Sequence, residues 1–421
     1  MNSILFGIFG LAVLLTIAML FSPNRKAINW RLVGSGIGLQ LLFALMVLKT
    51  QWGARLFEAL SKIFVTIISF TNAGASFVFG DLANYDGFGF IFAFQVLPTI
   101  IFFAALMGVL YHLGLMQIIV KGMAWVMYKV MRISGSESLS VAANVFVGQT
   151  EAPLVVRPYI ENMTQSELLT MMVGGMATIA GGVLAAYVAM LGGGDPQQQL
   201  FYAKHLLSAS IMAAPATIVL AKILMPETEE SLTKGEVKLN VEKTATNVIE
   251  AAANGASDGV RLALNVGGML LAFIALIAMI DYPLGAIGNL LGINESMGQP
   301  LNLSLILGWI LSPLAWVIGV PWNDAVTVGG LIGTKMVANE FVAYTNLNTI
   351  KETLSPQAVL ISTYALCGFA NFSSIAIQIG GIGGLAPNRR PDLARFGLRA
   401  VMGGTLATMM TATIAGVLTN L

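Results

Sequence analysis

The sequence has little charge and almost no cysteine or histidine. Asp, Glu, Lys and Arg make up 10% of its 421 residues, whereas ordinary soluble domains carry roughly 25%. The single cysteine, Cys367, excludes an intrachain disulfide framework and a cysteine-based metal cluster. The two histidines, His112 and His205, lie far apart and belong to no ligand-spaced cluster. With a formal net charge of +1, the composition offers no argument for nucleic-acid binding.

Hydrophobic residues, by contrast, account for 56% of the chain, and the mean hydropathy is +0.80. These values predict an all-α integral membrane protein. The first apolar run, 4–21, is long enough to span about 30 Å of hydrocarbon. It has no basic flank before it and no small-residue cleavage site, so we interpret it as a retained helix. The apolar segments fall near 4–21, 32–49, 89–111, 166–191, 200–225, 258–280, 301–320, 356–381 and 400–418.

Lysine and arginine predict the orientation of these segments, because basic loops stay on the cytoplasmic side. The N-terminus is expected outside, since the first apolar segment is followed by Arg25, Lys26 and Arg31. Later basic clusters are Lys121, Lys129 and Arg132; Lys234, Lys238 and Lys243; and Arg389, Arg390, Arg395 and Arg399. Loops 192–199 and 282–300 contain neither Lys nor Arg. One alternating topology, with both termini periplasmic, fits this pattern if 136–163 and 301–348 do not cross the membrane.

Those two segments are too polar at their middle to face lipid. The first reads "SESLSVAANVFVGQTEAPLVVRPYIENM" (136–163), and the second contains "PWNDAVTVGGLIGTKMVANEFVAY" (321–344). Each is interpreted as a re-entrant hairpin of two half-helices that meet at a polar tip. Non-helical backbone at membrane depth is tolerated only where it is buried in protein or lines a wet cavity. The tips are therefore the predicted site.

An internal repeat follows the two hairpins. "GMATI" (175–179) and "GFANF" (368–372) share the pattern Gly, large apolar, Ala, small polar, large apolar. Each interrupts an apolar segment, each follows a hairpin glutamate by a similar interval, and one extra crossing separates the two units. An odd number of crossings makes the units inverted. Inverted repeats with broken helices are the signature of a secondary transporter.

The run "GTKMVANEFVAY" (333–344) resembles the signature of concentrative nucleoside transporters. Four further runs resemble the bacterial, sodium-coupled branch of that family: "NVFVGQTEAPLVVRP" (144–158), "GGMATIAGG" (174–182), "GVPWNDA" (319–325) and "CGFANFSSIAI" (367–377). The resemblance covers nearly the whole chain. It implies eight transmembrane helices, two opposed re-entrant hairpins and several interfacial helices, assembled as a homotrimer that works as an elevator.

The same resemblance implies a division into two domains. A scaffold is formed by 1–111, with helices one to three, and by 226–299, with a linker and helix six. A mobile transport domain is formed by 112–225, with an interfacial helix, the first hairpin and helices four and five. Its second part, 300–421, holds another interfacial helix, the second hairpin and helices seven and eight.

The resemblance also implies the residues of a nucleoside site. Glu340 would accept hydrogen bonds from ribose hydroxyls, with Asn371 and Ser374 completing the sugar site. Asn371 and Ser374 share a face if their segment is helical. The remaining substrate residues are the base-reading Gln149, Thr150 and Glu151 and the apolar Leu262 and Phe369. An amide both donates and accepts, which suits an imide edge such as that of uracil.

Sodium is the coupling ion that the resemblance implies. Its ligands would be the side chains of Asn144 and Thr178 and the carbonyls of Val147 and Ile179. Sodium prefers hard oxygen ligands, which unwound backbone supplies. Position 178 often holds serine in sodium-coupled members, and threonine keeps the hydroxyl. No organic cofactor is expected.

The expected function is import of nucleosides, uridine first, by a sodium-driven symporter of the bacterial inner membrane. Its partners would be nucleoside and membrane lipid, with no nucleic acid. Proton-coupled nucleoside import, or elevator transport of another small polar metabolite, stays open. An intramembrane enzyme is disfavoured because Asp81, Asp195 and Asp281 fall at predicted membrane edges. A further alternative is structural: Glu151 and Glu340 would pair with Arg157 or Lys335.

Overall fold

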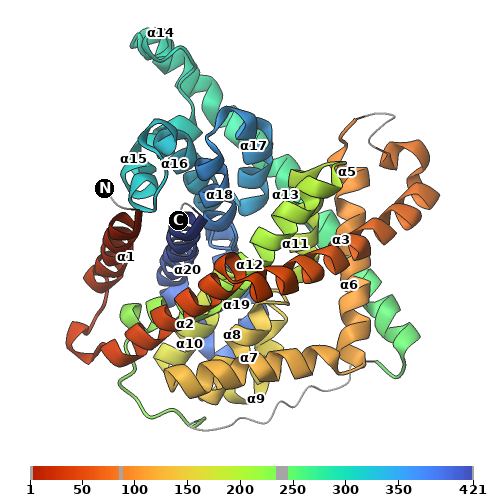
Figure 1. Ribbon diagram of the computed structural model, residues 1–421, viewed down its shortest axis with the longest axis vertical. Helices are drawn as coiled ribbons and strands as arrows, with labels where there is room; N and C mark the ends of the chain where they lie inside the picture. Colours follow the sequence, from red (N-terminus) through yellow and green to blue (C-terminus); the bar gives the residue numbers. More distant parts are fainter. Residues whose placement is uncertain (1–2, 85–88, 234–244, 420–421) are drawn as a thin grey trace.

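The computed structural model describes residues 3–84, 89–233 and 245–419, and every regular element in these ranges is helical (Figure 1). The predicted basic cluster of Lys234, Lys238 and Lys243 lies outside the described residues. Eight helical segments of this part of the chain are long and apolar enough to cross a membrane. They are Ser3–Leu20, Trp30–Lys49, Gln51–Ala83, Phe92–His112, Gln165–Gly192, Pro196–Leu224, Val248–Leu290 and Pro387–Thr419.

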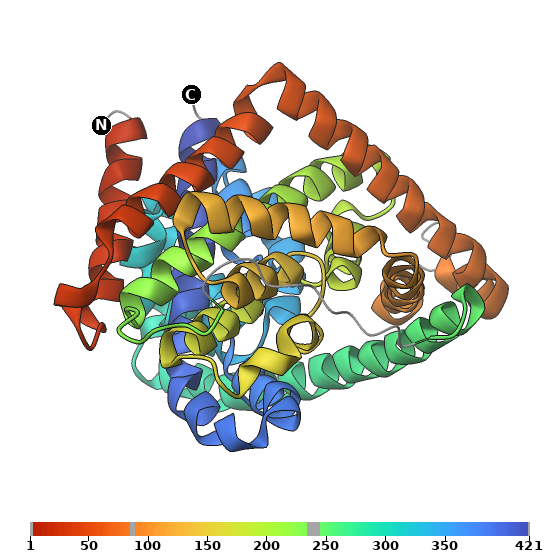
Figure 2. The same ribbon diagram turned by 90° about the horizontal axis from the view of Figure 1, so that it is seen from below.

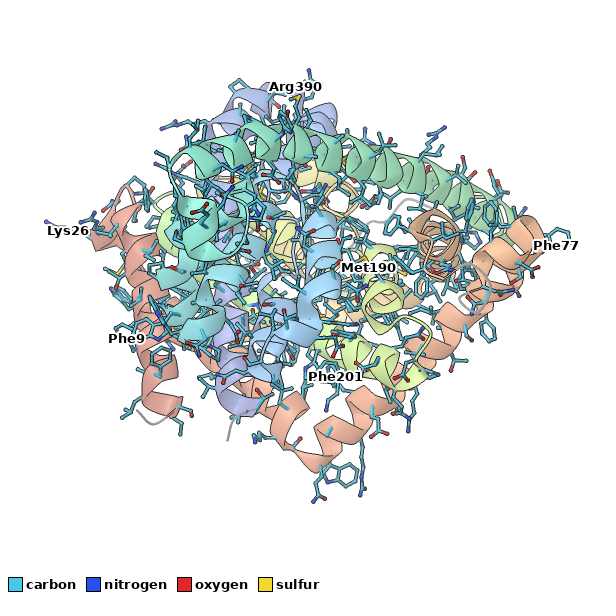
Figure 3. The ribbon with its side chains drawn as sticks, turned by 90° about the horizontal axis from the view of Figure 1, so that it is seen from above. Phe9, Lys26, Phe77, Met190, Phe201 and Arg390 are labelled. Atoms are coloured by element: carbon cyan, nitrogen blue, oxygen red, sulfur yellow. The ribbon has the colours of Figure 1, made fainter. Side chains whose placement is uncertain are left out.

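One of these segments is absent from the sequence prediction. Helix α3, Gln51–Phe79, begins one residue after the C-cap of α2, Trp30–Lys49. Three charged residues near its start hide its apolar character in the linear sequence, and two of them, Glu58 and Lys62, form an exposed ion pair at 2.7 Å. The side chains of Trp52 and Phe77 are 86% and 90% exposed, and Phe77 points away from the rest of the molecule (Figure 3).

The predicted apolar segment 356–381 is not one continuous helix. The structure divides it into α18, Pro356–Ala365, and α19, Phe372–Leu385, neither of which is long enough to span hydrocarbon alone. The predicted interruption near "GFANF" is therefore confirmed. The equivalent interruption near "GMATI" is also present, between α10, Gln165–Ala177, and α11, Gly181–Gly192.

The outer part of the molecule is built from helices α1, α2, α3, α6 and α13. Helix α1 is Ser3–Leu20, α6 is Leu97–His112 and α13 is Val248–Leu290. Viewed from below, α3 and α13 form two long outer edges (Figure 2). Helices α6 and α13 approach closely at small residues, because a β-carbon at Gly259 would lie 2.7 Å from the Cα of Ile101. Small residues allow such backbone contacts between membrane helices.

The central part contains the two repeat units. The first holds α8 (Gly135–Asn144), η3 (Ala152–Val156), α9 (Arg157–Ile160), α10, α11 and α12 (Pro196–Leu224). The second holds α16 (Trp322–Val337), α17 (Glu340–Ile350), α18, α19 and α20 (Arg390–Thr419). In the spans of α10–α11, α12 and α20, 83%, 89% and 89% of the apolar window is buried, against 22% for α1 and 17% for α13. The core therefore lies in the repeat units.

Shorter elements connect these parts. Helices α5 (Phe92–Gln95) and α7 (Leu115–Met131) flank α6, and α14 (Ile293–Met297) and α15 (Leu303–Val317) precede α16 at the end of the molecule opposite to α7 and α9 (Figure 1). Helices α15 and α16 meet at 117°. The 3-10 turns are η1 (Arg25–Ala27), η2 (Gly80–Ala83), η4 (Lys351–Thr353) and η5 (Pro387–Arg389). Helices α1 and α20 pack side by side, with Gly7 against Val417, so the two chain ends lie near each other (Figure 1).

Side-chain caps begin the half-helices of both units. Ser134 and Thr164 start α8 and α10 with capping boxes completed by Glu137 and Glu167. In the second unit, Asn339 accepts the backbone N–H of Val342 and so begins α17 directly after α16 has ended. Capping satisfies backbone donors that would otherwise be orphaned in an apolar environment. Asn339 therefore has a structural role at the tip of the second hairpin.

The two broken helices cross at their interruptions. A β-carbon at Gly368 would lie 2.8 Å from the carbonyl oxygen of Met176, at the end of α10. A β-carbon at Gly404 of α20 would lie 2.9 Å from the β-carbon of Met176. Larger residues at either glycine would separate the two units. Their close approach places both breaks in one small region at the centre of the protein.

Candidate substrate and cation site

A cavity of about 1590 Å³ lies beside the two breaks. Glu151 of the first hairpin and Glu340 of the second both line it, as the sequence argument requires. All eight predicted substrate residues are in its wall: Gln149, Thr150, Glu151, Leu262, Glu340, Phe369, Asn371 and Ser374. Residues separated by up to 225 positions therefore converge on one space.

Glu340 is buried, with 4% of its surface exposed, and its two carboxylate oxygens are both hydrogen-bonded. The hydroxyl of Tyr187 donates to Oε1 at 3.1 Å, and Nδ2 of Asn371 donates to Oε2 at 2.9 Å. Each oxygen has a second lone pair, so the carboxylate keeps acceptor capacity on its cavity side. These two bonds reduce the cost of burying the group, which is several kcal/mol for an unpaired ion.

The alternative that the hairpin glutamates serve ion pairs finds no support among the described residues. Lys335 donates instead to the carbonyl oxygen of Ala365 at 2.9 Å and to Oγ1 of Thr408 at 3.2 Å. No ion pair within the described chain joins Arg157 to Glu151, whose side chain is exposed to the cavity. Neither carboxylate therefore forms a direct ion pair there, although Lys335 is close enough to act on Glu340 electrostatically.

The amide of Gln149 connects the first hairpin to the second unit. Its Nε2 donates to Oγ of Ser374 at 3.1 Å, and its Oε1 accepts a bond from Nε2 of Gln378 at 3.1 Å. The same Gln378 nitrogen donates to the carbonyl of Met172 on α10 at 2.9 Å. Gln149 is therefore held in one orientation by α19 and α10.

Asn371 and Ser374 lie close together, although only Ser374 lies inside a helix. Asn371 is the N-cap of α19, and its Oδ1 accepts the backbone N–H of Ser374 at 2.9 Å. The helix therefore begins after Asn371, which leaves Nδ2 of this residue available for Glu340. Both side chains are buried and line the cavity, so the predicted pair is brought together by a cap.

Two apolar residues line the cavity from different parts of the fold. Phe369, half-buried, belongs to the interruption between α18 and α19. Leu262 belongs to α13 of the outer part and is 37% exposed. Of the predicted substrate residues, Leu262 alone comes from an outer helix.

The four predicted cation ligands lie at the first hairpin and the first break. Asn144 is 1% exposed; its Nδ2 donates to the carbonyl of Ser140, and its Oδ1 has no hydrogen-bond partner within the described residues. Thr178 Oγ1 donates to the carbonyl of Gly174 at 2.8 Å. A β-carbon at Gly174 would lie 3.2 Å from Nδ2 of Asn144, so Gly174 contacts both residues.

Val147 lines the cavity, whereas Asn144, Thr178 and Ile179 are buried behind its wall. Buried polar atoms are nearly always paired, so Oδ1 of Asn144, one of several buried side-chain atoms without a protein partner among the described residues, is available to a ligand. An oxygen of this kind, next to unwound backbone, fits a hard cation such as sodium.

The cavity also has charged residues in its wall. Its wall includes Lys121, Arg157 and Arg261 together with Asp258 and Glu161. Among the described residues, none from the loops 192–199 or 282–300 lines it. The site is therefore open towards the end of the molecule that carries the basic loops.

Two residues of the site escaped the sequence analysis. Gln378 lies one turn after Ser374 on α19, and this i, i+4 spacing could have revealed it. Tyr187 is the hydrogen-bond donor to Glu340 and stacks on Tyr344 at 4.5 Å between ring centroids. Its contact with Glu340 joins positions 153 apart and has no local signal in the sequence.

Two opposed hairpins, two broken helices and a shared polar cavity define a secondary transporter with an inverted repeat. The comparisons with known proteins specify the family. The family model for the C-terminus of Na+ dependent nucleoside transporters matches residues 205–416, and the model for their N-terminus matches residues 9–82. A model described as "Nucleoside recognition" matches residues 93–194.

Relatives and solved structures agree with these matches. An uncharacterized transporter of Haemophilus influenzae is 47% identical over 100% of this chain and 99% of the relative. The human sodium/nucleoside cotransporter 1 is 41% identical over 97% of this chain, which corresponds to 63% of the human protein. A structure of CNTnw in an inward-facing substrate-bound state has a TM-score of 0.90 at 45% identity, with both chains fully covered. The chain belongs to the concentrative nucleoside transporter family, and it is a multi-pass membrane transporter, not an enzyme.

Proposed function

We propose that this protein is a sodium-driven symporter that imports nucleosides, with uridine as a substrate. The observation that carries this proposal is the convergence of Glu340, Gln149 and Glu151 on one cavity, with the unpaired Oδ1 of Asn144 behind its wall. The family supplies the substrate class, and these side chains support the choice within it.

Glu340 is proposed to bind the ribose. Its carboxylate is fixed by Tyr187 and Asn371, so its remaining lone pairs have a set direction before the substrate arrives. Adjacent sugar hydroxyls would donate to these lone pairs, and hydrogen bonds to a charged acceptor are roughly twice as strong as neutral ones. Ser374 would contribute a hydroxyl on the same side.

The tip of the first hairpin is proposed to bind the base. Gln149, Thr150 and Glu151 present an amide, a hydroxyl and a carboxylate, which together can match the alternating donors and acceptors of an imide edge. Phe369 and Leu262 would contact the faces of the ring. This arrangement favours a neutral substrate that carries hydroxyl groups over an anion.

Sodium is proposed to bind at Asn144, Val147, Thr178 and Ile179, and to be coupled to the base through α10. A β-carbon at Gly174 would contact Asn144, and one at Gly175 would lie 2.7 Å from the β-carbon of Gln149. An ion that fixes the end of α10 against Asn144 would therefore also fix the surface on which Gln149 rests. Each ligand would raise the affinity of the other by the same factor.

The larger assembly is also proposed here. The scaffold (1–111 and 226–299) would hold the trimer contacts, and the transport domain (112–225 and 300–421) would move as an elevator. The outer position of α3 and α13 and the central position of the repeat units support this division (Figure 2). We place the protein in a bacterial inner membrane with both termini periplasmic. The side-by-side packing of α1 and α20 supports one part of this proposal, that both termini lie on the same side.

Uptake of labelled uridine into proteoliposomes tests the proposal. A sodium gradient is expected to drive accumulation, and replacement of sodium by choline at constant pH is expected to abolish it. Accumulation driven equally by a proton gradient without sodium would favour the proton-coupled alternative. Stabilisation of the purified protein by a dicarboxylate and not by uridine would favour a different metabolite.

A further inference from the structure

Lys335 is a buried cation that the proposed transport cycle does not use. It lies in the last turn of α16, is 0% exposed, and forms no ion pair within the described chain. Its Nζ donates to two neutral oxygens, the carbonyl of Ala365 and Oγ1 of Thr408. Glu340 acts on this ammonium electrostatically but does not pair with it directly. An ammonium group buried without a direct carboxylate contact is costly, so its retention calls for a specific reason.

The carbonyl oxygen of Ala365 supplies part of the reason why a lysine is buried at this position. Ala365 is the last residue of α18, so its carbonyl is one of the four that a helix end leaves unpaired. The C-terminal end of a helix carries a partial negative charge that a cation stabilises. Lys335 therefore holds the end of α18 immediately before the interruption that contains Phe369 and Asn371.

The first repeat unit has the same local arrangement without a lysine. Asn144 ends the first helix of its hairpin, as Lys335 lies in the last turn of its own. Asn144 contacts Gly174 near the end of α10, and a β-carbon at Gly174 would lie 3.7 Å from Cγ2 of Thr217 on α12.

In the second unit, a β-carbon at Gly368 would lie 2.9 Å from Cγ2 of Thr408 on α20, the helix that occupies the position of α12. In the repeat, Gly368 corresponds to Gly175, which directly follows Gly174. A hairpin end, a glycine at the broken helix and a threonine of the following helix therefore lie near one another in both units. The difference is that one unit presents an unpaired amide oxygen and the other presents an ammonium group.

We propose that the ammonium of Lys335 is a built-in cation next to the counterpart of the sodium site, where it positions the end of α18 and hence Asn371, the residue that corresponds to Thr178. The proposal rests on the proposed function, in which the first unit binds an exchangeable sodium ion at Asn144 and Thr178. The second unit then binds no exchangeable ion, because its cation is covalently part of the chain. Removal of the side chain leaves an oxygen-lined space that a small monovalent cation can enter.

Lys335→Ala and Lys335→Met distinguish a cation from a space-filling side chain. With Lys335→Ala, uridine uptake at low sodium is expected to fall about tenfold or more, as expected for loss of a charge-assisted contact. High sodium, or added methylammonium or ethylammonium, is expected to restore part of the uptake, and the dependence on sodium is expected to become steeper. Lys335→Met fills the space without a charge, so its uptake is expected to fall without rescue.

Lys351→Ala is the matched control. Lys351 also donates to a carbonyl near a helix end, that of Leu191 at 2.7 Å, but it is half-buried and remote from both breaks. Its removal is expected to leave the steepness of the sodium dependence unchanged and to create no response to amines. Thr408→Val keeps the lysine and removes one of its two oxygens, so the KM for uridine is expected to rise several-fold at unchanged sodium steepness.

Each result decides the proposal. Uptake at the wild-type level by the Lys335→Met variant would overturn it, and so would an unchanged KM for uridine in the Thr408→Val variant. A Lys335→Ala protein that folds but whose uptake responds to neither sodium nor amines would also overturn it. If Lys335→Ala does not fold, Lys335→Met and Thr408→Val still decide. The wild-type protein is measured in the same vesicles. If its uptake does not depend on sodium, the proposed function is contradicted. The response of Lys335→Ala to amines and the KM of Thr408→Val for uridine still test the proposed role of Lys335 in that case.

Discussion

The two repeat units share one architecture and differ in chemistry. In each, a hairpin helix ends beside a broken helix, and a threonine of the following helix lies close to the break. The first unit presents Gln149, Thr150 and Glu151 to the cavity and has an unpaired oxygen on Asn144. The second presents Glu340, Asn371 and Ser374 and contains the ammonium of Lys335.

This difference indicates how two repeat units of the same architecture can take different parts in binding one substrate. Because the units are inverted, their hairpin tips approach the membrane centre from opposite sides and meet in one cavity. Each unit can then specialise in one end of an asymmetric substrate. The comparison predicts that changes in the second unit affect sugar binding, whereas changes in the first affect base preference and sodium.

Glu340→Gln is expected to have the largest effect. The side chain keeps its shape but loses its charge. In the unsubstituted protein Nδ2 of Asn371 donates to the carboxylate, and in the variant this nitrogen faces an amide group instead. Loss of two charge-assisted bonds of about 1.5 kcal/mol each predicts an affinity for uridine lower by on the order of 100-fold. Binding and uptake of uridine and of its deoxy analogues measure this. Normal uridine transport by the variant would refute the sugar-site assignment.

Gln149→Ala is expected to change the preference among bases by about tenfold, because the amide that matches a donor and an acceptor on the base is removed. Competition between uridine, cytidine and adenosine in uptake experiments measures the preference. The sodium concentration for half-maximal uptake is the internal control. A larger change in sodium dependence than in base preference would place Gln149 with the cation site.

Thr178→Val replaces the hydroxyl by a methyl group of similar size. Removal of one neutral ligand worth about 1 kcal/mol is expected to raise the sodium needed for half-maximal uptake by about fivefold. Uridine affinity at saturating sodium is expected to stay close to that of the wild type. If both quantities changed in parallel, the side chain would act through the packing of α10 and not through sodium.

Tyr187→Phe is expected to have the smallest effect, about a threefold loss of uridine affinity. The phenol donates one bond to Glu340, while Asn371 continues to donate the other and water can take the vacated position. The ring still packs edge-on against Phe341 and at a tilt against Tyr344, so thermal stability is expected to change little. Titration with uridine followed by calorimetry measures the affinity, and a loss as large as that of Glu340→Gln would show that Tyr187 controls the ionisation of the site.

Much of the fold was predictable because insertion of a segment into a membrane depends on the local composition of that segment. Apolar runs indicate the spans, and the polar residues in the middle of 136–163 and 321–344 indicate the hairpins. Helix α3 was missed because Arg55, Glu58 and Lys62 interrupt its apolar run in the sequence, although in the helix the Glu58–Lys62 pair lies on the exposed side. The long apolar helix is recognisable only once that side is known.

The site was predictable to a different extent. Residues with their own motifs, such as Glu340 in "GTKMVANEFVAY", could be assigned from resemblance, and the structure brings them together. Tyr187 and Gln378 could not, because their roles depend on partners more than 150 positions away. Lys335 was considered as an ion-pair partner of Glu340, whereas its ammonium bonds to Ala365 and Thr408.

The sequence by itself determined that this chain enters a membrane, where its hairpins and helix breaks lie, and which family it resembles. These properties follow from hydrophobicity, capping residues and motifs, all of which act over short stretches of chain. Tertiary structure alone decided that Asn371 caps α19 and bonds to Glu340, and that Gln149 is held by α19 and α10. Hydrogen bonds depend on distance and angle between groups from different helices, and only the packing of both units sets these.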